Sequence, residues 1–171
     1  MLNELEQGVY DKNKKELLRF ATAKGYDKVV NQLLNEGVNP NLEIQEKNET
    51  TTLCYLAAEN DHVEVVNALL EKGADPNVAR SDDGATPLIV AAENGHLRVA
   101  AVLLMDRAEP NKAANPNIAD SNNKTPLIAA VENDDVDMME LLLSANAEPT
   151  ISGAALSGSI DALLLRSTEN T

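Results

Sequence analysis

One stretch of the sequence recurs along the chain and constrains the fold more than any other feature. It runs from Gly84 to Leu104 and reads GATPLIVAAENGHLRVAAVLL. The stretch opens with Thr-Pro-Leu, passes through the small pair Ala91-Ala92, is interrupted at Gly95 and closes with an apolar run. Apolar residues at helical spacing on both sides of a glycine predict two short amphipathic helices joined by a tight turn.

Copies of this stretch return at nearly regular intervals. The first small residue of each copy marks its position, and these residues are Ala21, Ala57, Ala91, Ala130 and Ala154. The intervals between them are 36, 34, 39 and 24 residues. A period of about 33 residues with a T-P-L-x-x-A signature is the pattern of ankyrin repeats. From about Asn13 to Arg166, the chain therefore resembles an ankyrin-repeat protein.

The resemblance implies an all-α fold, an ankyrin-repeat α-solenoid with short hairpin-like finger loops. We expect one domain over residues 1–166, followed by a frayed tail over 167–171. The domain would hold about four repeats, roughly 13–45, 46–80, 81–118 and 119–150, and a shortened C-terminal cap over 151–166. The last interval is too short for a finger, so the cap is expected as a helix pair near 152–156 and 160–166.

Local signals place the elements inside the repeats. Residues 2–9 are expected to form a short separate helix, and Asn13 with Glu16 has the form of a capping box that starts a second helix near 14–23. Asn39-Pro40-Asn41 would lead into the first finger, and Asp82-Asp83-Gly84 would turn the second. Further helices are expected at 53–59, 63–70, 126–132 and 136–143, with Gly37, Gly73 and Asn146 at helix ends that need a positive φ.

The third repeat carries a local duplication. Ala108-Glu109-Pro110-Asn111 is repeated as Ala114-Asn115-Pro116-Asn117. We infer a six-residue insertion over 108–114, at the base of the third finger. Two interpretations stay open, a drifted loop without function and a loop that contributes to specificity.

Charge excludes one class of function. The chain carries 14 basic and 28 acidic residues, a net charge of −14, which argues against nucleic-acid binding because that affinity depends on neutralising phosphates. The basic residues cluster: residues 12–28 carry a charge of +4 and the remainder −18. We expect a basic N-terminal end and an acidic body that attracts cationic partners.

Residues that could carry catalysis are few. His62 and His96 lie one repeat apart in the same slot after the turn, and in ankyrin repeats this slot typically forms a local hydrogen bond between turns. The single cysteine, Cys54, fits a reducing compartment and a buried position. We therefore expect a chain that is not an enzyme, with no catalytic set, metal or cofactor. Neither a signal peptide nor a membrane span is evident, so a cytoplasmic location is expected, or a host cytoplasm for a bacterial effector.

The resemblance implies a binding surface on the concave face, lined by the fingers and by the first helix of each repeat. Two kinds of first-helix position are expected there, residues that point into the concavity and three Glu-Asn pairs that form an acidic ladder with amide donors beside it. The plainer alternative is that Glu-Asn is only a solvated helix end. The expected positions are Arg19, Tyr55, Ile89 and Ile128 for the first kind and Glu59, Asn60, Glu93, Asn94, Glu132 and Asn133 for the ladder, with Asp82, Asp83, Asn122 and Lys124 as finger-tip candidates.

These residues predict a non-catalytic module that binds a protein partner with a basic or mixed surface, through an apolar strip flanked by carboxylates. We expect a monomer that binds neither nucleic acid nor membrane. Two alternatives stay open. The chain could be an interaction domain of a larger protein such as a bacterial effector, or a structural protein that self-associates head to tail through its basic end and acidic body.

Overall fold

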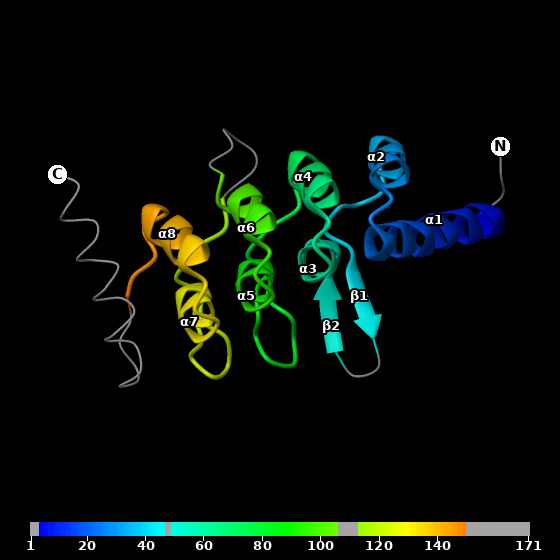
Figure 1. Ribbon diagram of the computed structural model, residues 1–171. Coiled ribbons are helices and arrows are strands. Elements are labelled where there is room, and N and C mark those ends of the chain that lie inside the picture. The colour runs from blue at the N-terminus through cyan, green and yellow to red at the C-terminus, as the bar shows by residue number, and fades with distance from the viewer. Residues whose placement is uncertain (1–3, 47–48, 106–112, 150–171) are drawn as a thin grey trace.

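A computed structural model describes residues 4–46, 49–105 and 113–149 as a row of stacked helix pairs (Figure 1). The inner row holds α1 (Glu4–Lys24), α3 (Leu53–Glu59), α5 (Pro87–Glu93) and α7 (Pro126–Glu132). The outer row holds α2 (Asp27–Asn35), α4 (Val63–Glu71), α6 (Leu97–Leu104) and α8 (Val136–Ser144). Finger loops project below the inner row, and the first is an antiparallel hairpin of β1 (Glu43–Glu46) and β2 (Glu49–Thr52). The all-α solenoid and its finger hairpin are thus confirmed.

Each inner helix after α1 begins at a threonine that caps it. The hydroxyls of Thr52, Thr86 and Thr125 accept hydrogen bonds from backbone amides three residues on, at 3.1, 3.3 and 3.3 Å. These bonds satisfy donors that a helix start leaves unpaired. A proline follows in α5 and α7 at the first helical turn, where its missing N–H costs nothing. The Thr-Pro motif therefore fixes where these helices start.

The turn between the two helices of a repeat needs a left-handed residue. Gly25 and Gly95 both have a φ of +69° there, and Asp61 has a φ of +57°. In the second and third repeats a histidine follows this residue and reaches back to the preceding repeat: His62 Nε2 lies 3.1 Å from the Ala23 carbonyl oxygen, and His96 Nε2 lies 3.2 Å from that of Glu59. The structural role expected for the two histidines is confirmed.

The core follows the row of helices and contains almost no aromatic side chains. Leucines such as Leu69, Leu88 and Leu103 are fully buried, with Met138 and Met139 at the C-terminal side. Alanines on the inner helices are equally buried. Small side chains let neighbouring helices approach closely, so each repeat buries its surface against the next one rather than around one centre.

Asparagines tie each repeat to the following one at the base of the fingers. The side chain of Asn41 accepts a hydrogen bond from the Asp75 amide at 2.8 Å and donates one to the Gly73 carbonyl at 2.9 Å. Asn77 accepts from the Asn115 amide at 2.7 Å, and Asn117 accepts from the Glu148 amide at 2.7 Å. The same link therefore recurs along the solenoid.

The structure corrects the N-terminal prediction. Residues 4–24 form one continuous helix, so the separate helix over 2–9 and the capping box at Asn13 are wrong. Asp11, Lys12 and Asn13 are exposed, where a poor helix former costs only a few tenths of a kcal/mol to about 1 kcal/mol. Breaking the helix would leave a full set of end groups to be capped, which is the larger cost.

The structure also shows which copy of the duplicated segment belongs to the repeat. The Ala114 amide donates to the Leu103 carbonyl at 2.8 Å, as those of Ala74 and Ala147 do to Leu69 and Leu142. Ala114 therefore holds the repeat position, and the extra residues precede it. Residues 106–112 lie outside the described ranges, as do the C-terminal cap over 151–166 and the tail.

Candidate protein-binding face

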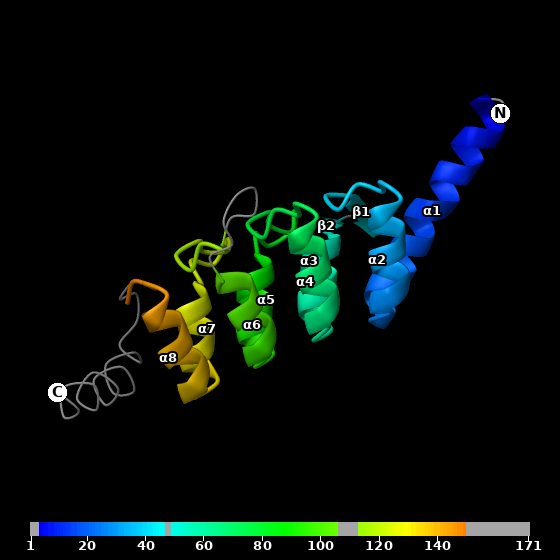
Figure 2. The ribbon, with the colours of Figure 1, turned by 90° about the horizontal axis from the view of Figure 1, so that it is seen from above.

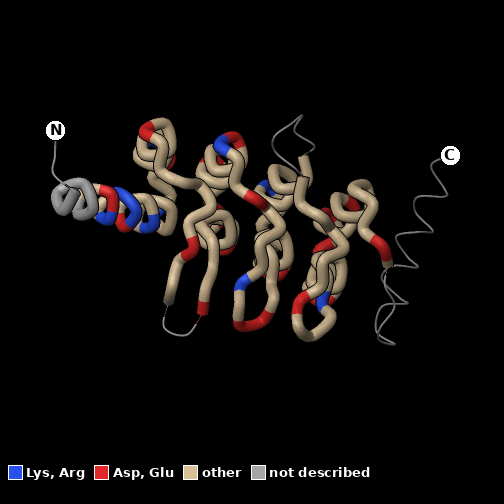
Figure 3. Tube along the Cα trace, turned by 180° about the vertical axis from the view of Figure 1, so that it is seen from behind, with Lys and Arg blue, Asp and Glu red and all other residues tan. Residues whose placement is uncertain are grey.

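The surface that the sequence assigns to binding is called the finger face. It comprises three fingers (the β1–β2 hairpin, residues 80–85 and residues 120–125) and the exposed sides of the inner helices. In Figure 3, acidic positions outnumber basic ones among the charged positions of the fingers, and the second and third fingers each carry one basic position. The basic positions gather instead on α1.

Hydrogen bonds join each finger to the next. The Ser81 amide donates to the Thr50 carbonyl at 2.9 Å, and the Thr50 amide donates to the Ser81 hydroxyl at 2.7 Å. Between the second and third fingers, the Ser121 amide donates to the Asp83 carbonyl at 2.7 Å. The face is therefore preformed, which lowers the ordering entropy that binding would cost.

The first charged cluster on this face surrounds Arg80. Its guanidinium lies 2.9 Å from Asp82, pairs with Asp83 and stacks over the ring of Tyr55 at 5.0 Å from the ring centroid. The hydrogen bond from Arg80 lowers the pKa of Asp83, and burial raises that of Tyr55. Two carboxylates around one cation leave the cluster a charge of −1.

The second cluster surrounds Lys124. Its ammonium lies 2.9 Å from Glu132 at the end of α7 and 3.2 Å from Glu93 at the end of α5. The hydrogen bond with Glu132, reinforced by Glu93, raises the pKa of Lys124. The third finger is thus clamped to two inner helices, and this cluster again keeps a charge of −1.

The asparagines of the predicted ladder are engaged within the solenoid. Asn60 and Asn94 donate to carbonyls of their own helices at 2.8 and 2.9 Å. Asn133 instead donates to the Glu93 carbonyl of the preceding repeat at 2.7 Å. Glu59 is exposed and has no ion-pair partner among the described side chains. Of the three ladder carboxylates, Glu59 faces solvent, whereas Glu93 and Glu132 pair with Lys124, and the three asparagine amides already donate within the solenoid.

Two residues expected to point into the concavity are buried. Tyr55 is 3% exposed and Ile89 is 0% exposed, so the expected apolar strip is wrong at both positions. The first turn of an inner helix packs beneath the fingers, as the position of Arg80 over Tyr55 shows. Ile128 remains half-buried.

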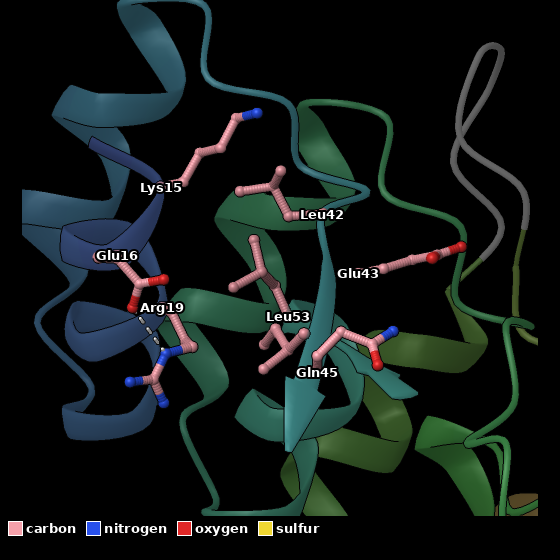
Figure 4. Close-up of a pocket in the computed structure, with 8 residues that line it drawn as sticks. Lys15, Glu16, Arg19, Leu42, Glu43, Gln45 and Leu53 are labelled. Carbon is pink, nitrogen blue, oxygen red and sulfur yellow. Dashed lines mark hydrogen bonds and ion pairs between the residues drawn. The ribbon is translucent and has the colours of Figure 1, made fainter. Parts of the chain in front are cut away.

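A hollow lies at the N-terminal end of the finger face, between α1 and β1 (Figure 4). Its volume is about 520 Å³. In the described part of the sheet, β1 pairs only with β2, so its other edge faces this hollow. Arg19, which bonds Glu16 at 3.3 Å, is one wall, and the full lining is Lys15, Glu16, Arg19, Leu42, Glu43, Ile44, Gln45 and Leu53.

Sequence reasoning missed the hollow and both charge clusters. The hollow depends on how far α1 stands from the first finger, for which the sequence carries no local signal. Arg80, just before Asp82-Asp83-Gly84, was a signal for the first cluster, because an arginine beside a two-carboxylate turn has partners within reach.

Other kinds of site find little support in the described ranges. No three His, Cys, Asp or Glu side chains gather there in a way that could hold a metal ion. Cys54 is buried, and burial raises the pKa of its thiol to about 12. Over the same ranges, no helix has the length and apolar character needed to cross a membrane.

Stacked helix pairs with finger loops define a repeat solenoid, and comparison with known families identifies which one. A family model described as "Ankyrin repeats (3 copies)" matches residues 79–153, and one described as "Ankyrin repeats (many copies)" matches residues 53–104. The two matches together span more than half of the chain. The chain belongs to the ankyrin-repeat family, whose members are generally protein–protein interaction modules. A search of curated proteins found no match.

Proposed function

We propose that the finger face binds a protein partner of mixed charge in one fixed orientation. The observation that carries the proposal is the charge of the two clusters. Each cation on the fingers, Arg80 and Lys124, is outnumbered by two carboxylates. A surplus of negative charge on a preformed surface attracts lysine and arginine side chains.

The opposite end of the face lies beside α1, where residues 12–24 carry five basic side chains and one acidic one. Lys15 and Arg19 line the hollow there together with the carboxylates of Glu16 and Glu43, and its apolar walls are Leu42, Ile44 and Leu53. An acidic segment with an apolar anchor matches this end, and a basic segment matches the other. A partner with that order of charges would bind in one direction, because the reverse direction places like charges together.

The test uses binders selected from a displayed peptide library against the intact chain. For a selected binder, Glu59→Lys should weaken binding by about tenfold or more, because a carboxylate contact becomes a like-charge contact. Glu140→Lys is the matched control: it makes the same charge change on exposed α8, in the outer row, and should change affinity less than twofold. Isothermal titration calorimetry measures both.

A second pair of variants tests the orientation. Lys15→Glu should weaken the same binder, and reversing the order of charged residues in the peptide should abolish binding by the native chain. If Glu59→Lys and Glu140→Lys behave alike, the partner does not use the finger face. If the reversed peptide binds equally well, the face does not fix orientation, and binding rests on non-specific charge.

A further inference from the structure

Within the described residues, the first finger has one edge that no neighbouring finger covers. Elsewhere each finger hydrogen-bonds to the next one: the Ser81 amide donates to the Thr50 carbonyl, and the Ser121 amide donates to the Asp83 carbonyl. On the outer side of the first finger, α1 stands across the hollow from β1 (Figure 4). The hollow therefore occupies the place in which a preceding finger would bond to β1.

The backbone groups on this outer edge can be identified from the contacts of β2. The N–H and the C=O of Thr50 both bond to Ser81 rather than to β1. Thr50 and the residue opposite it, Gln45, therefore form a non-hydrogen-bonded pair of the antiparallel ladder. Such pairs alternate with hydrogen-bonded ones, so Glu43 and Thr52 form the next pair of this kind. The N–H and C=O groups of Glu43 and Gln45 thus point away from β2, toward the hollow, and an unpaired edge of this kind is a template for another strand.

The form of the hollow suits one extended chain. Its volume of about 520 Å³ lies within the range of roughly 300–1,000 Å³ that is typical of ligand sites. The other helix pairs stand side by side in Figure 2, whereas α1 slants away from them, which leaves space beside β1. α1 also forms the far wall of the hollow. The outer edge of one added strand would therefore be covered by α1, and no further strand could follow.

Apolar side chains around the edge select one residue of the added strand. Leu42 and Ile44 lie on the same side of the extended chain, because side chains alternate along it. Together with Leu53 they form an apolar wall of the hollow. An apolar residue opposite Ile44 would pack against this wall, as cross-strand neighbours on one face of a sheet do.

Charge selects a second residue. Arg19 bonds Glu16 at 3.3 Å, and the side chain of Glu43 extends to the side away from α1 (Figure 4). Lys15 is exposed, and none of the carboxylates in the described ranges pairs with it. Figure 4 shows Lys15 and Leu42 at the same end of the hollow. A carboxylate opposite Leu42 would therefore lie within reach of the Lys15 ammonium.

We propose that an extended acidic segment of the partner binds in the hollow as a third strand, antiparallel to β1. The antiparallel direction gives the more stable ladder per residue, and it places the residue opposite Leu42 two positions after the residue opposite Ile44. The recognised segment is therefore an apolar residue followed two positions later by an aspartate or glutamate. Its backbone bonds to Glu43 and Gln45 supply affinity, and the two side chains supply specificity. This mode of binding rests on the proposed function, because it specifies how the acidic part of the partner is held.

Amide hydrogen exchange, followed by NMR on the intact chain, tests the added strand. The probe is a synthetic peptide of about seven residues with blocked ends, all threonine except for a central valine and a glutamate two positions later. At saturation, it should slow exchange of the Glu43 and Gln45 amides by at least about tenfold, because both amides gain acceptors.

Two methylated peptides form a matched pair. In the antiparallel register, the threonine after the valine lies opposite Glu43 and its N–H faces β1, whereas the valine N–H faces away. N-methylation of that threonine should therefore abolish the protection of both amides. N-methylation of the valine should leave the protection in place, although the added methyl group is the same.

Variants of the chain test the same contacts from the other side. Gln45→Pro removes one outward N–H, and proline is tolerated in an edge strand at a position that makes no ladder bond. It should weaken peptide binding at least about fivefold more than Gln45→Ala, which loses the same side chain but keeps the N–H. Lys15→Glu should weaken binding of the glutamate peptide, and a peptide with lysine in that place should bind this variant more tightly than the native chain. Protection of the Ile44 amide, which is bonded to β2, checks that the hairpin stays formed.

The outcomes separate this mode of binding from the proposed function. A native chain that binds no peptide at millimolar concentration overturns the added strand, and so does a bound peptide that protects neither the Glu43 nor the Gln45 amide. Equal effects of the two methylated peptides, or of the two Gln45 variants, overturn it as well. A library-selected binder that Glu59→Lys weakens but that protects neither amide keeps the finger face as the binding surface and overturns only the strand.

Discussion

Gly25 offers the sharpest test of how neighbouring repeats are joined. It has a φ of +69°, and a Cβ added to it would lie 2.6 Å from Nδ1 and 2.8 Å from Cε1 of His62. Real Cβ atoms essentially never lie within 3.0 Å of another heavy atom in this way, so the imidazole must move and release its hydrogen bond to the Ala23 carbonyl. Gly95 has the same φ, but its Cβ would find nothing nearer than 3.6 Å. An alanine at either position would therefore suffer the same left-handed backbone strain, but only the alanine at position 25 would also clash with His62.

The magnitudes separate the two variants. The left-handed backbone costs an alanine about 1 kcal/mol, and this should be nearly all of the effect of Gly95→Ala. Gly25→Ala adds the lost histidine hydrogen bond, about 1 kcal/mol, and about 1 kcal/mol of overpacking. We therefore expect Gly25→Ala to lower the free energy of unfolding by about 3 kcal/mol, roughly 2 kcal/mol more than Gly95→Ala.

Urea denaturation followed by far-ultraviolet circular dichroism measures the difference. A double-mutant cycle identifies its cause: in a His62→Ala background the clash is gone, so Gly25→Ala should cost no more than Gly95→Ala does. Equal effects of the two glycine variants in the native background would refute the reasoning. They would mean that His62 moves aside freely and that its bond to the preceding repeat contributes little.

Three further changes test other contacts. Asn77→Ala removes the hydrogen-bonded link to the next repeat and should lower the free energy of unfolding by about 1 to 2 kcal/mol. Asn122→Ala, at an exposed finger tip, should lower it by less than about 0.5 kcal/mol. Urea denaturation measures both. The raised pKa of Lys124 means that its bonds stabilise the fold below the ordinary pKa of 10.5 and are lost as pH rises through the raised value. At high pH the native chain should therefore lose up to about 1 kcal/mol of its free energy of unfolding, a loss that the Lys124→Met variant should not show. Thermal melts measure the stability of both proteins against pH, and equal pH profiles would contradict this prediction. Cys54, buried with a thiol pKa of about 12, should react with a thiol reagent at neutral pH only when the chain opens, so labelling as fast as that of a free thiol would show that the site is exposed.

The sequence predicted those parts of the fold that local rules determine. A capping threonine, a first-turn proline and a helical apolar period all act within one repeat, so α3 and α7 have the bounds expected for them. The positive φ at Asn146, +62°, was predictable for the same reason. Asparagine tolerates that conformation better than other residues with a side chain.

Contacts between repeats were harder to predict. Lys124 meets Glu93 across 31 positions of sequence, and a finger-tip lysine carries no local sign of that partner. The burial of Tyr55 likewise depends on Arg80, which belongs to the next finger. The length of α1 was missed because weak helix formers in its middle cost less than a second helix start would. Predictions of site residues from the sequence were therefore wrong where the exposure of a side chain depends on a neighbouring repeat.

The asparagine links also bear on how the molecule would respond to a pulling force. Asn41, Asn77 and Asn117 each accept a hydrogen bond from the backbone of the following repeat. A chain held by its two ends should release one repeat at a time, because each link joins only two neighbouring repeats. Each release would lengthen it by roughly 33 residues, or about 110 Å. Extension traces from optical tweezers would show these steps as a regular staircase.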